Sequence, residues 1–231
     1  MASSSIALTP EEQAAFLQSV ENVRLAGLRV LDAPPGGLAV VALVRHLQRG
    51  VDSVVTAAVD QGLHLDCRQG CSHCCHARVE ALWPEVFQIA GALALLVPTE
   101  QAAIVVRLQA HLAAQTEDDG QPDAPWSRRP ACPFLRDRLC SIYTVRPATC
   151  RKTHSRDVAA CQTDAALIPQ SFHVALNTEA LQAGTAAAYR QRGLEAQPQE
   201  LVQAVLQALR DPSALGRWQR GEPVFAEPGP Q

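Results

Sequence analysis

The chain has 231 residues, enough for one large domain or two small ones, and its 47% hydrophobic content is typical of a globular protein. Only 4% of the residues are aromatic, so Leu, Val and Ala must supply most of the core, which favours helices over an aromatic-rich sandwich or barrel. The net charge of −3 excludes a globally basic nucleic-acid binder. No apolar run approaches the ~20 residues of a membrane-spanning helix.

The first predicted helix begins at Pro10. Thr9 can cap it, proline suits the first helical position, and Glu12 stands three residues after the cap. The Pro- and Gly-rich segment 33–37 predicts a turn that separates the first helix from the next. Residues 38–63 then have the pattern of one long helix or two shorter ones.

The remaining segments are also mainly helical. Residues 116–130 are rich in Asp, Gly and Pro and predict a surface loop. Further helices are expected at 84–97, 98–115, from Pro147 through Cys150, at 177–191 and at 199–210. We therefore expect a mainly α fold, an irregular helical domain organised around a cysteine-rich site, with little or no sheet. The expected organisation is a single domain over 1–222, a cysteine-cluster core at about 60–165, and a flexible tail at 223–231.

The sequence contains eight cysteines. The N-terminus has neither a basic nor an apolar signal region, so we expect a cytoplasmic, reducing location. Clustered thiols in such a compartment bind metal or carry out redox chemistry more often than they form disulfides. We predict all eight as metal ligands, and they form two groups: Cys67, Cys71, Cys74 and Cys75, and then Cys132, Cys140, Cys150 and Cys161.

The cysteine spacing suits soft thiolate coordination of zinc or of an iron–sulfur cluster. Gaps of two or three residues let a tight turn direct two sulfurs at one centre, and Gly70 can supply a backbone conformation that other residues resist. The second group starts 57 positions after Cys75, so metal binding would be coupled to folding. Adjacent side chains diverge, so the pair Cys74-Cys75 suits two metals, or a cluster with one thiol left over. Two four-ligand zinc sites and one four-thiolate 4Fe–4S cluster with four further thiols both remain open.

Basic residues crowd the second cysteine group, where Asp137 is the only acid between Trp126 and Arg156. Guanidinium groups there can offset the negative charge of a thiolate-rich centre and donate hydrogen bonds to sulfur. A solvated basic face is the alternative. A phosphate-binding role is disfavoured because aromatic residues are sparse, so nucleic acid is not an expected partner.

These motifs resemble the YkgJ-type cysteine cluster family, also described as the zinc- or iron-chelating CxxCxxCC family. The resemblance covers about residues 60–165 and implies zinc or iron bound through the cysteines. It extends to the cysteine core of flagellin lysine-N-methylases. The matching features are Cys67-x3-Cys71-x2-Cys74-Cys75, Cys132-Pro-Phe-Leu, Cys140-Ser-Ile-Tyr-x-x-Arg146-Pro147-x-x-Cys150-Arg151, and the following Cys161.

We expect a metal-binding protein, with an iron–sulfur cluster slightly preferred over zinc because of the vicinal cysteines and the basic surroundings. Electron transfer or redox chemistry is its expected use. Two alternatives stay open: an enzyme of the lysine methyltransferase or oxidoreductase type, and a thiol redox switch or metal chaperone. The first cysteine spacing also equals the radical-SAM triplet, but a helical segment precedes it where that fold has a strand. A protein partner stays open, a membrane partner is not expected, and the sequence assigns no catalytic residue.

Four other polar residues near the cysteines are candidate ligands. His73, His76 and His154 can complete a coordination shell, although histidines beside such sites more often serve the surface or the surrounding scaffold. Glu85 is better explained as a helix-start residue, favoured by the helix dipole, than as an oxygen ligand.

Overall fold

The computed structural model describes residues 8–32, 38–118, 128–163, 165 and 167–224. In this part of the chain, regular structure is almost entirely helical, which confirms the mainly α prediction. The longer helices are α1 (Pro10–Leu31), α2 (Leu38–Asp60), α3 (Trp83–Ala94), α4 (Pro98–Asp118), α7 (Phe172–Gln191) and α8 (Leu201–Arg210), and the shorter ones are α5 (Ala148–Lys152), α6 (Val158–Gln162) and α9 (Ala214–Gln219).

The strands are only two residues long and pair antiparallel. β1 (Glu80–Ala81) pairs with β4 (Gln199–Glu200), and β2 (Leu135–Arg136) pairs with β3 (Leu139–Cys140). These short ladders connect loops to one another and do not form a separate layer. The expectation of little sheet is therefore also confirmed.

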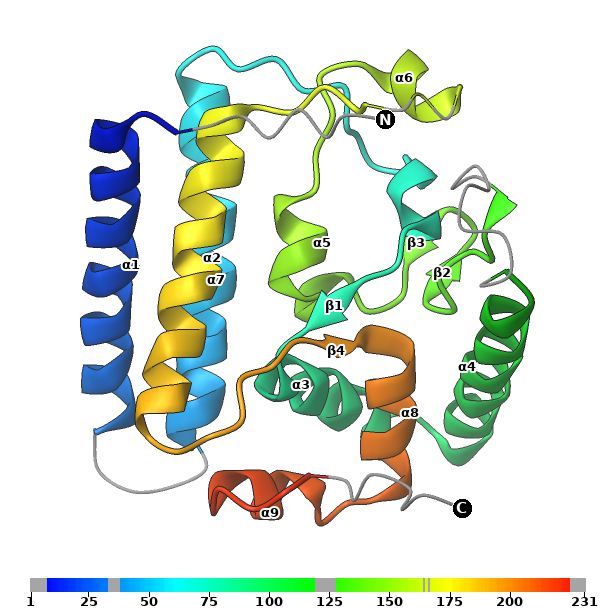
Figure 1. Cartoon of the computed structure of the whole chain (residues 1–231). Coiled ribbons are helices and arrows are strands. Elements are labelled where there is room, and N and C mark those ends of the chain that lie inside the picture. Colours follow the sequence, from blue (N-terminus) through cyan, green and yellow to red (C-terminus); the bar gives the residue numbers. More distant parts are fainter. Residues whose placement is uncertain (1–7, 33–37, 119–127, 164, 166, 225–231) are drawn as a thin grey trace.

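One side of the molecule is a layer of α1, α2 and α7 (Figure 1). The capping box predicted for α1 is present, because Thr9 accepts from the Glu12 N–H and the Glu12 side chain accepts from the Thr9 N–H. α1 and α7 approach closely at Gly184. A Cβ at Gly184 would lie 2.5 Å from the Val23 Cβ and 2.6 Å from the Val20 carbonyl oxygen. Only glycine fits this crossing without displacing α1.

The other side packs α8 against α3 and α4, with α9 below (Figure 1). Val86 and Ile89 of α3 are fully buried there, as is Val205 of α8. The rings of Tyr189 and Trp218 meet edge to face with centroids 5.3 Å apart, which joins the end of α7 to α9. One hydrophobic cluster therefore links both sides, and a smaller one packs α2 against α5.

Several boundaries differ from the sequence-based predictions. α7 begins at Phe172, five residues before the predicted start at residue 177, because the Ser171 hydroxyl accepts from the Val174 N–H and caps it. α2 runs through Gly50 as one long helix, the first of the two predicted possibilities; a Cβ at Gly50 would lie 3.2 Å from the Leu181 side chain, so the glycine serves packing. α6 and α9 were not predicted, since five or six residues give too short a pattern to recognise.

The loop predicted at 116–130 and the tail predicted at 223–231 lie largely outside the described residues. Val224 is buried and accepts a hydrogen bond from Arg217 through its carbonyl oxygen. No helix in the described ranges combines the length and apolarity of a membrane span.

Candidate metal centre

The two cysteine groups, distant in sequence, lie side by side in the structure. The Cys132 N–H donates to the Cys75 carbonyl oxygen at 2.7 Å, which joins the groups through their backbones. The four segments that carry the thiols are the 67–76 loop, the 132–140 hairpin, α5 and α6. In Figure 1, α5 lies in the centre against α2 and α7, α6 lies at the upper right, and the hairpin lies on the right.

Cys67 is attached to the segment that leads into α6. The Ser155 N–H donates to the Cys67 sulfur at 3.2 Å, and the Asp66 N–H donates to the Ser155 carbonyl oxygen at 3.0 Å. The Asp66 carboxylate accepts from the N–H of Val158, the first residue of α6, at 2.9 Å. Because α6 carries Cys161 and contacts the 3₁₀ turn of His73–His76, these bonds place Cys161 beside the first cysteine group.

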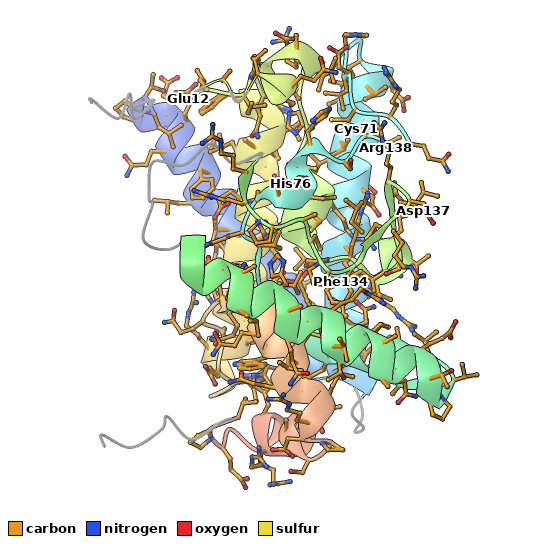
Figure 2. All side chains as sticks on the ribbon, turned by 90° about the vertical axis from the view of Figure 1, so that its right-hand side faces the viewer. Glu12, Cys71, His76, Phe134, Asp137 and Arg138 are labelled. Carbon is orange, nitrogen blue, oxygen red and sulfur yellow. The ribbon has the colours of Figure 1, made fainter. Side chains whose placement is uncertain are left out.

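Gly70 forms the turn between Cys67 and Cys71. Its φ of +81° is the left-handed conformation expected for a glycine in this gap, and the Cys71 N–H donates to the Arg68 carbonyl oxygen at 2.9 Å. Arg138 Nε donates to the Gly70 carbonyl oxygen at 3.0 Å, so the hairpin holds this turn from outside. Figure 2 shows Cys71 and Arg138 next to each other on the same face.

A tight hairpin presents Cys140. Asp137 and Arg138 have φ values of +49° and +63°, as in a two-residue turn with both central residues left-handed. Cys140 pairs with Leu135 across the ladder. The turn was missed in the sequence because such positions usually carry Asn-Gly or Asp-Gly, and Asp-Arg gives no such signal.

The residues on both sides of Cys132 are held by side chains of α4 and of the 3₁₀ turn. Arg107 Nε donates to the Pro133 carbonyl oxygen at 3.2 Å, and His111 Nδ1 hydrogen-bonds the Ala131 carbonyl oxygen at 3.0 Å. His76 Nδ1 lies 2.8 Å from the Arg129 carbonyl oxygen. Cys132 is therefore held by neighbours on both sides.

Glu85 positions the helix that carries Cys150. Its carboxylate is 1% exposed and accepts from the Leu82 N–H at 3.1 Å, as expected of a helix-start residue. It also accepts from the Ala148 N–H, at the start of α5, at 2.7 Å. Burial raises the Glu85 pKa, while the two backbone donors lower it. The second bond could not be foreseen, because it joins residues 63 positions apart.

The thiols form two electrostatic neighbourhoods that share Cys74 of the vicinal pair. Set A consists of Cys67, Cys71 and Cys161, and set B consists of Cys132, Cys140 and Cys150. In set A, the pKa of Cys67 is raised mainly by burial and further by the thiolates of Cys71, Cys74 and Cys161. In set B, the pKa of Cys150 is raised mainly by burial and further by Cys132, Cys74 and Cys140.

Cys74 lies between the two sets. Its pKa is raised chiefly by a hydrogen bond with the Cys75 side chain, then by burial and the Cys75 charge. Burial raises the pKa of Cys132 to about 11, and the thiolates of Cys140 and Cys74 add to the shift. All eight sulfurs are free thiols in this structure. Neighbouring thiolates thus repel one another in both sets, and a bound cation would relieve that repulsion.

Within the described ranges, no three His, Cys, Asp or Glu side chains adopt the close geometry of a metal site. The structure brings together the segments that carry the cysteines, and the charges of their thiols act on one another. Each sulfur can still change position by rotation about χ1. Thiolate donors on adjacent loops fit a soft metal ion or an iron–sulfur cluster.

His154 serves the scaffold. It is 4% exposed, its Nε2 accepts from the Ser171 N–H at 2.8 Å, and its Nδ1 lies 2.7 Å from the Lys152 carbonyl oxygen. Both ring nitrogens are engaged, so the imidazole orders the entry to α7 rather than offering a lone pair to a metal.

Residues 66–171 match a family model, the CxxCxxCC domain, described as a putative zinc- or iron-chelating domain. The cysteine-rich segment is similar to this domain. No curated protein and no solved structure is significantly similar to the chain. The match spans all eight cysteines and confirms the resemblance inferred from their spacing. Zinc or iron chelation is therefore the function that the family description gives to the CxxCxxCC domain.

Proposed function

We propose that the protein holds metal in two four-thiolate centres. Each centre takes the three cysteines of one set and one thiol of the vicinal pair Cys74-Cys75. The observation that carries the proposal is the backbone bond from Cys132 to Cys75, because it brings set B against the segment of set A. Four thiolates are the usual ligand number for tetrahedral zinc and for a 4Fe–4S cluster.

The electrostatics of the thiols support a resident cation. Burial and neighbouring thiolates raise the pKa of Cys67, Cys132 and Cys150, so each set contains thiols that release their protons less readily than an ordinary cysteine. A soft divalent ion or a cluster replaces the protons and offsets the repulsion. The same raised pKa values speak against a redox switch, which needs thiols of low pKa.

We favour an iron–sulfur cluster over zinc, with electron transfer as its use. Structural zinc sites usually draw ligand pairs from one turn at a spacing of two to four residues. Set B instead takes one thiol from a loop, one from the β2–β3 hairpin and one from α5, so its ligands do not come from one turn. In this arrangement each thiol of the vicinal pair serves a different centre, which requires the hydrogen bond between the Cys74 and Cys75 side chains to open.

We also propose that α1 to α9 form one domain around this site. The same hydrophobic core contains Leu28 of α1, Ile89 of α3 and Trp218 of α9. A single cooperative unfolding transition, seen alike by far-UV and near-UV circular dichroism, is expected. Two separate transitions would contradict the single domain.

The two-centre arrangement is tested by removing thiols from one set at a time. Anaerobically purified C71S/C161S and C140S/C150S variants are analysed for zinc, iron and acid-labile sulfide per chain, with Ser72→Ala as the matched control. Each double variant is expected to retain about half of the wild-type metal, and the control all of it. Equal and complete loss in both double variants would indicate one centre. A metal-free, folded wild type would remove the proposal.

A further inference from the structure

Arg146 stands between two thiols of set B. It precedes α5, with Cys140 on one side in sequence and Cys150 on the other. Its carbonyl oxygen accepts from Arg151 Nε at 2.9 Å and from Gln48 Nε2 at 3.4 Å. Its guanidinium carbon lies 3.8 Å from the centroid of the Tyr143 ring. Backbone and side chain are therefore both held in place.

The Arg146 Nε atom is buried and has no hydrogen-bond partner among the described residues. Buried donors without an acceptor are uncommon in folded proteins, and each calls for an explanation. Two other arginines of the cysteine-rich region, in contrast, have partners for their guanidinium groups. Arg151 pairs with Asp52 at 2.6 Å, and Arg138 donates to the Gly70 carbonyl oxygen. The unused donor thus belongs to an arginine that lies between Cys140 and Cys150 in the sequence.

The charge of Arg146 reaches these thiols. It lowers the pKa of Cys140 and of Cys150 against the larger effect of burial, and it acts in the same direction on Cys74. A guanidinium that stabilises three neighbouring thiolates and has a free N–H is arranged to donate to sulfur.

We infer that Arg146 Nε–H donates a hydrogen bond to a metal-bound thiolate of the set B centre. The inference rests on the proposed function, because the acceptor sulfur is one that a metal holds in its thiolate form. Four thiolates around a divalent ion leave a net negative charge, which the guanidinium offsets. The hydrogen bond also draws electron density from the sulfur and weakens its donation to the metal.

The test uses cobalt(II), whose sulfur-to-metal charge-transfer band reports how strongly thiolates donate. The full-length chain, stripped and reloaded with cobalt(II), is compared with R146M and R146K. Arg136→Met is the matched control, since Arg136 is an exposed arginine on β2 of the same hairpin. R146M is expected to lose cobalt to a competing chelator at least tenfold more readily, the lower bound typical of removing a partner of a metal ligand. Its band is expected to move to lower energy.

R146K keeps the charge but moves the donor, so its retention is expected between wild type and R146M. R136M is expected to match wild type in both readouts. An unmoved band in R146M, with or without weaker retention, would overturn the inference, because a purely structural role changes occupancy and not donor strength. Failure of the wild type to take up cobalt, zinc or iron would instead overturn the proposed function.

Discussion

Removing the Glu85 carboxylate should destabilise the fold and loosen the helix that carries Cys150. In Glu85→Ala, the N–H groups of Leu82 and Ala148 lose their acceptor in a site where Glu85 is 1% exposed. A buried donor left unpaired costs about 1–3 kcal/mol, so two cost about 2–6 kcal/mol. Relief of carboxylate burial offsets part of this. We expect a net loss of about 2–5 kcal/mol in the free energy of unfolding.

Urea unfolding of metal-stripped, reduced protein, followed by far-UV circular dichroism, measures this loss. Glu100→Ala is the matched control, because Glu100 is an exposed first-turn glutamate that also follows a proline at a helix start. Loss of its interaction with the helix dipole should cost about 0.3–1 kcal/mol. If the two variants agree within about 0.5 kcal/mol, the size of an ordinary surface effect, the bridging role of Glu85 is refuted.

Glu85 also predicts a pH dependence. Its pKa in the folded protein is above the ordinary 4.5, mainly because of burial, so its stabilising contribution is complete below pH 4.5. That contribution is lost as the pH rises through the folded-state pKa. The stability advantage of wild type over Glu85→Gln should therefore shrink with rising pH. An advantage that grows with pH would contradict this sign.

Three further predictions concern glycines and protons. Gly184→Ala should lower the free energy of unfolding by about 1–3 kcal/mol, because the added methyl group overpacks α1 against α7. The control Gly91→Ala, with nothing within 4 Å of the added Cβ, should leave this free energy unchanged or raise it by about 0.5–1 kcal/mol. Equal melting temperatures of the two variants would contradict the close approach at Gly184. Gly70→Ala, also in open space but at φ +81°, should cost about 1–2 kcal/mol, and Gly70→Asn less; an unchanged urea midpoint in Gly70→Ala would exclude strain there. Zinc affinity of the stripped protein should fall as the pH is lowered from 9 to 6, because burial and neighbouring charge raise the pKa of thiols such as Cys132, and a pH-independent titration would argue against thiolate ligands.

Local signals in the sequence predicted much of the fold. The Thr9 capping box, the short helix after Pro147 and the turn at Gly70 each depend on residues only a few positions apart. The predicted start of α7 was wrong because several residues can cap a helix, and Ser171 caps this one ahead of the predicted start. Periodicity alone does not distinguish between such caps.

The gathering of the cysteines was predicted from their spacing, but their division into sets was not. Cys161 joins set A through the bonds between Asp66 and α6, although it follows the second group in sequence. The α5 anchor at Glu85 and the free donor of Arg146 depend equally on contacts between distant segments. Sequence spacing identifies the residues whose side chains are chemically suited to such contacts. Only the folded chain shows which of these residues meet.

Thiolate coordination of the metal can be measured by X-ray absorption spectroscopy at the metal edge of the anaerobically purified chain. Zinc or iron is expected to show a first shell of sulfur at about 2.3 Å, the usual metal–thiolate distance. That shell should lose sulfur when Cys132 or Cys71 is replaced by serine. A first shell of oxygen and nitrogen alone, or a sulfur shell unchanged in both variants, would contradict thiolate coordination.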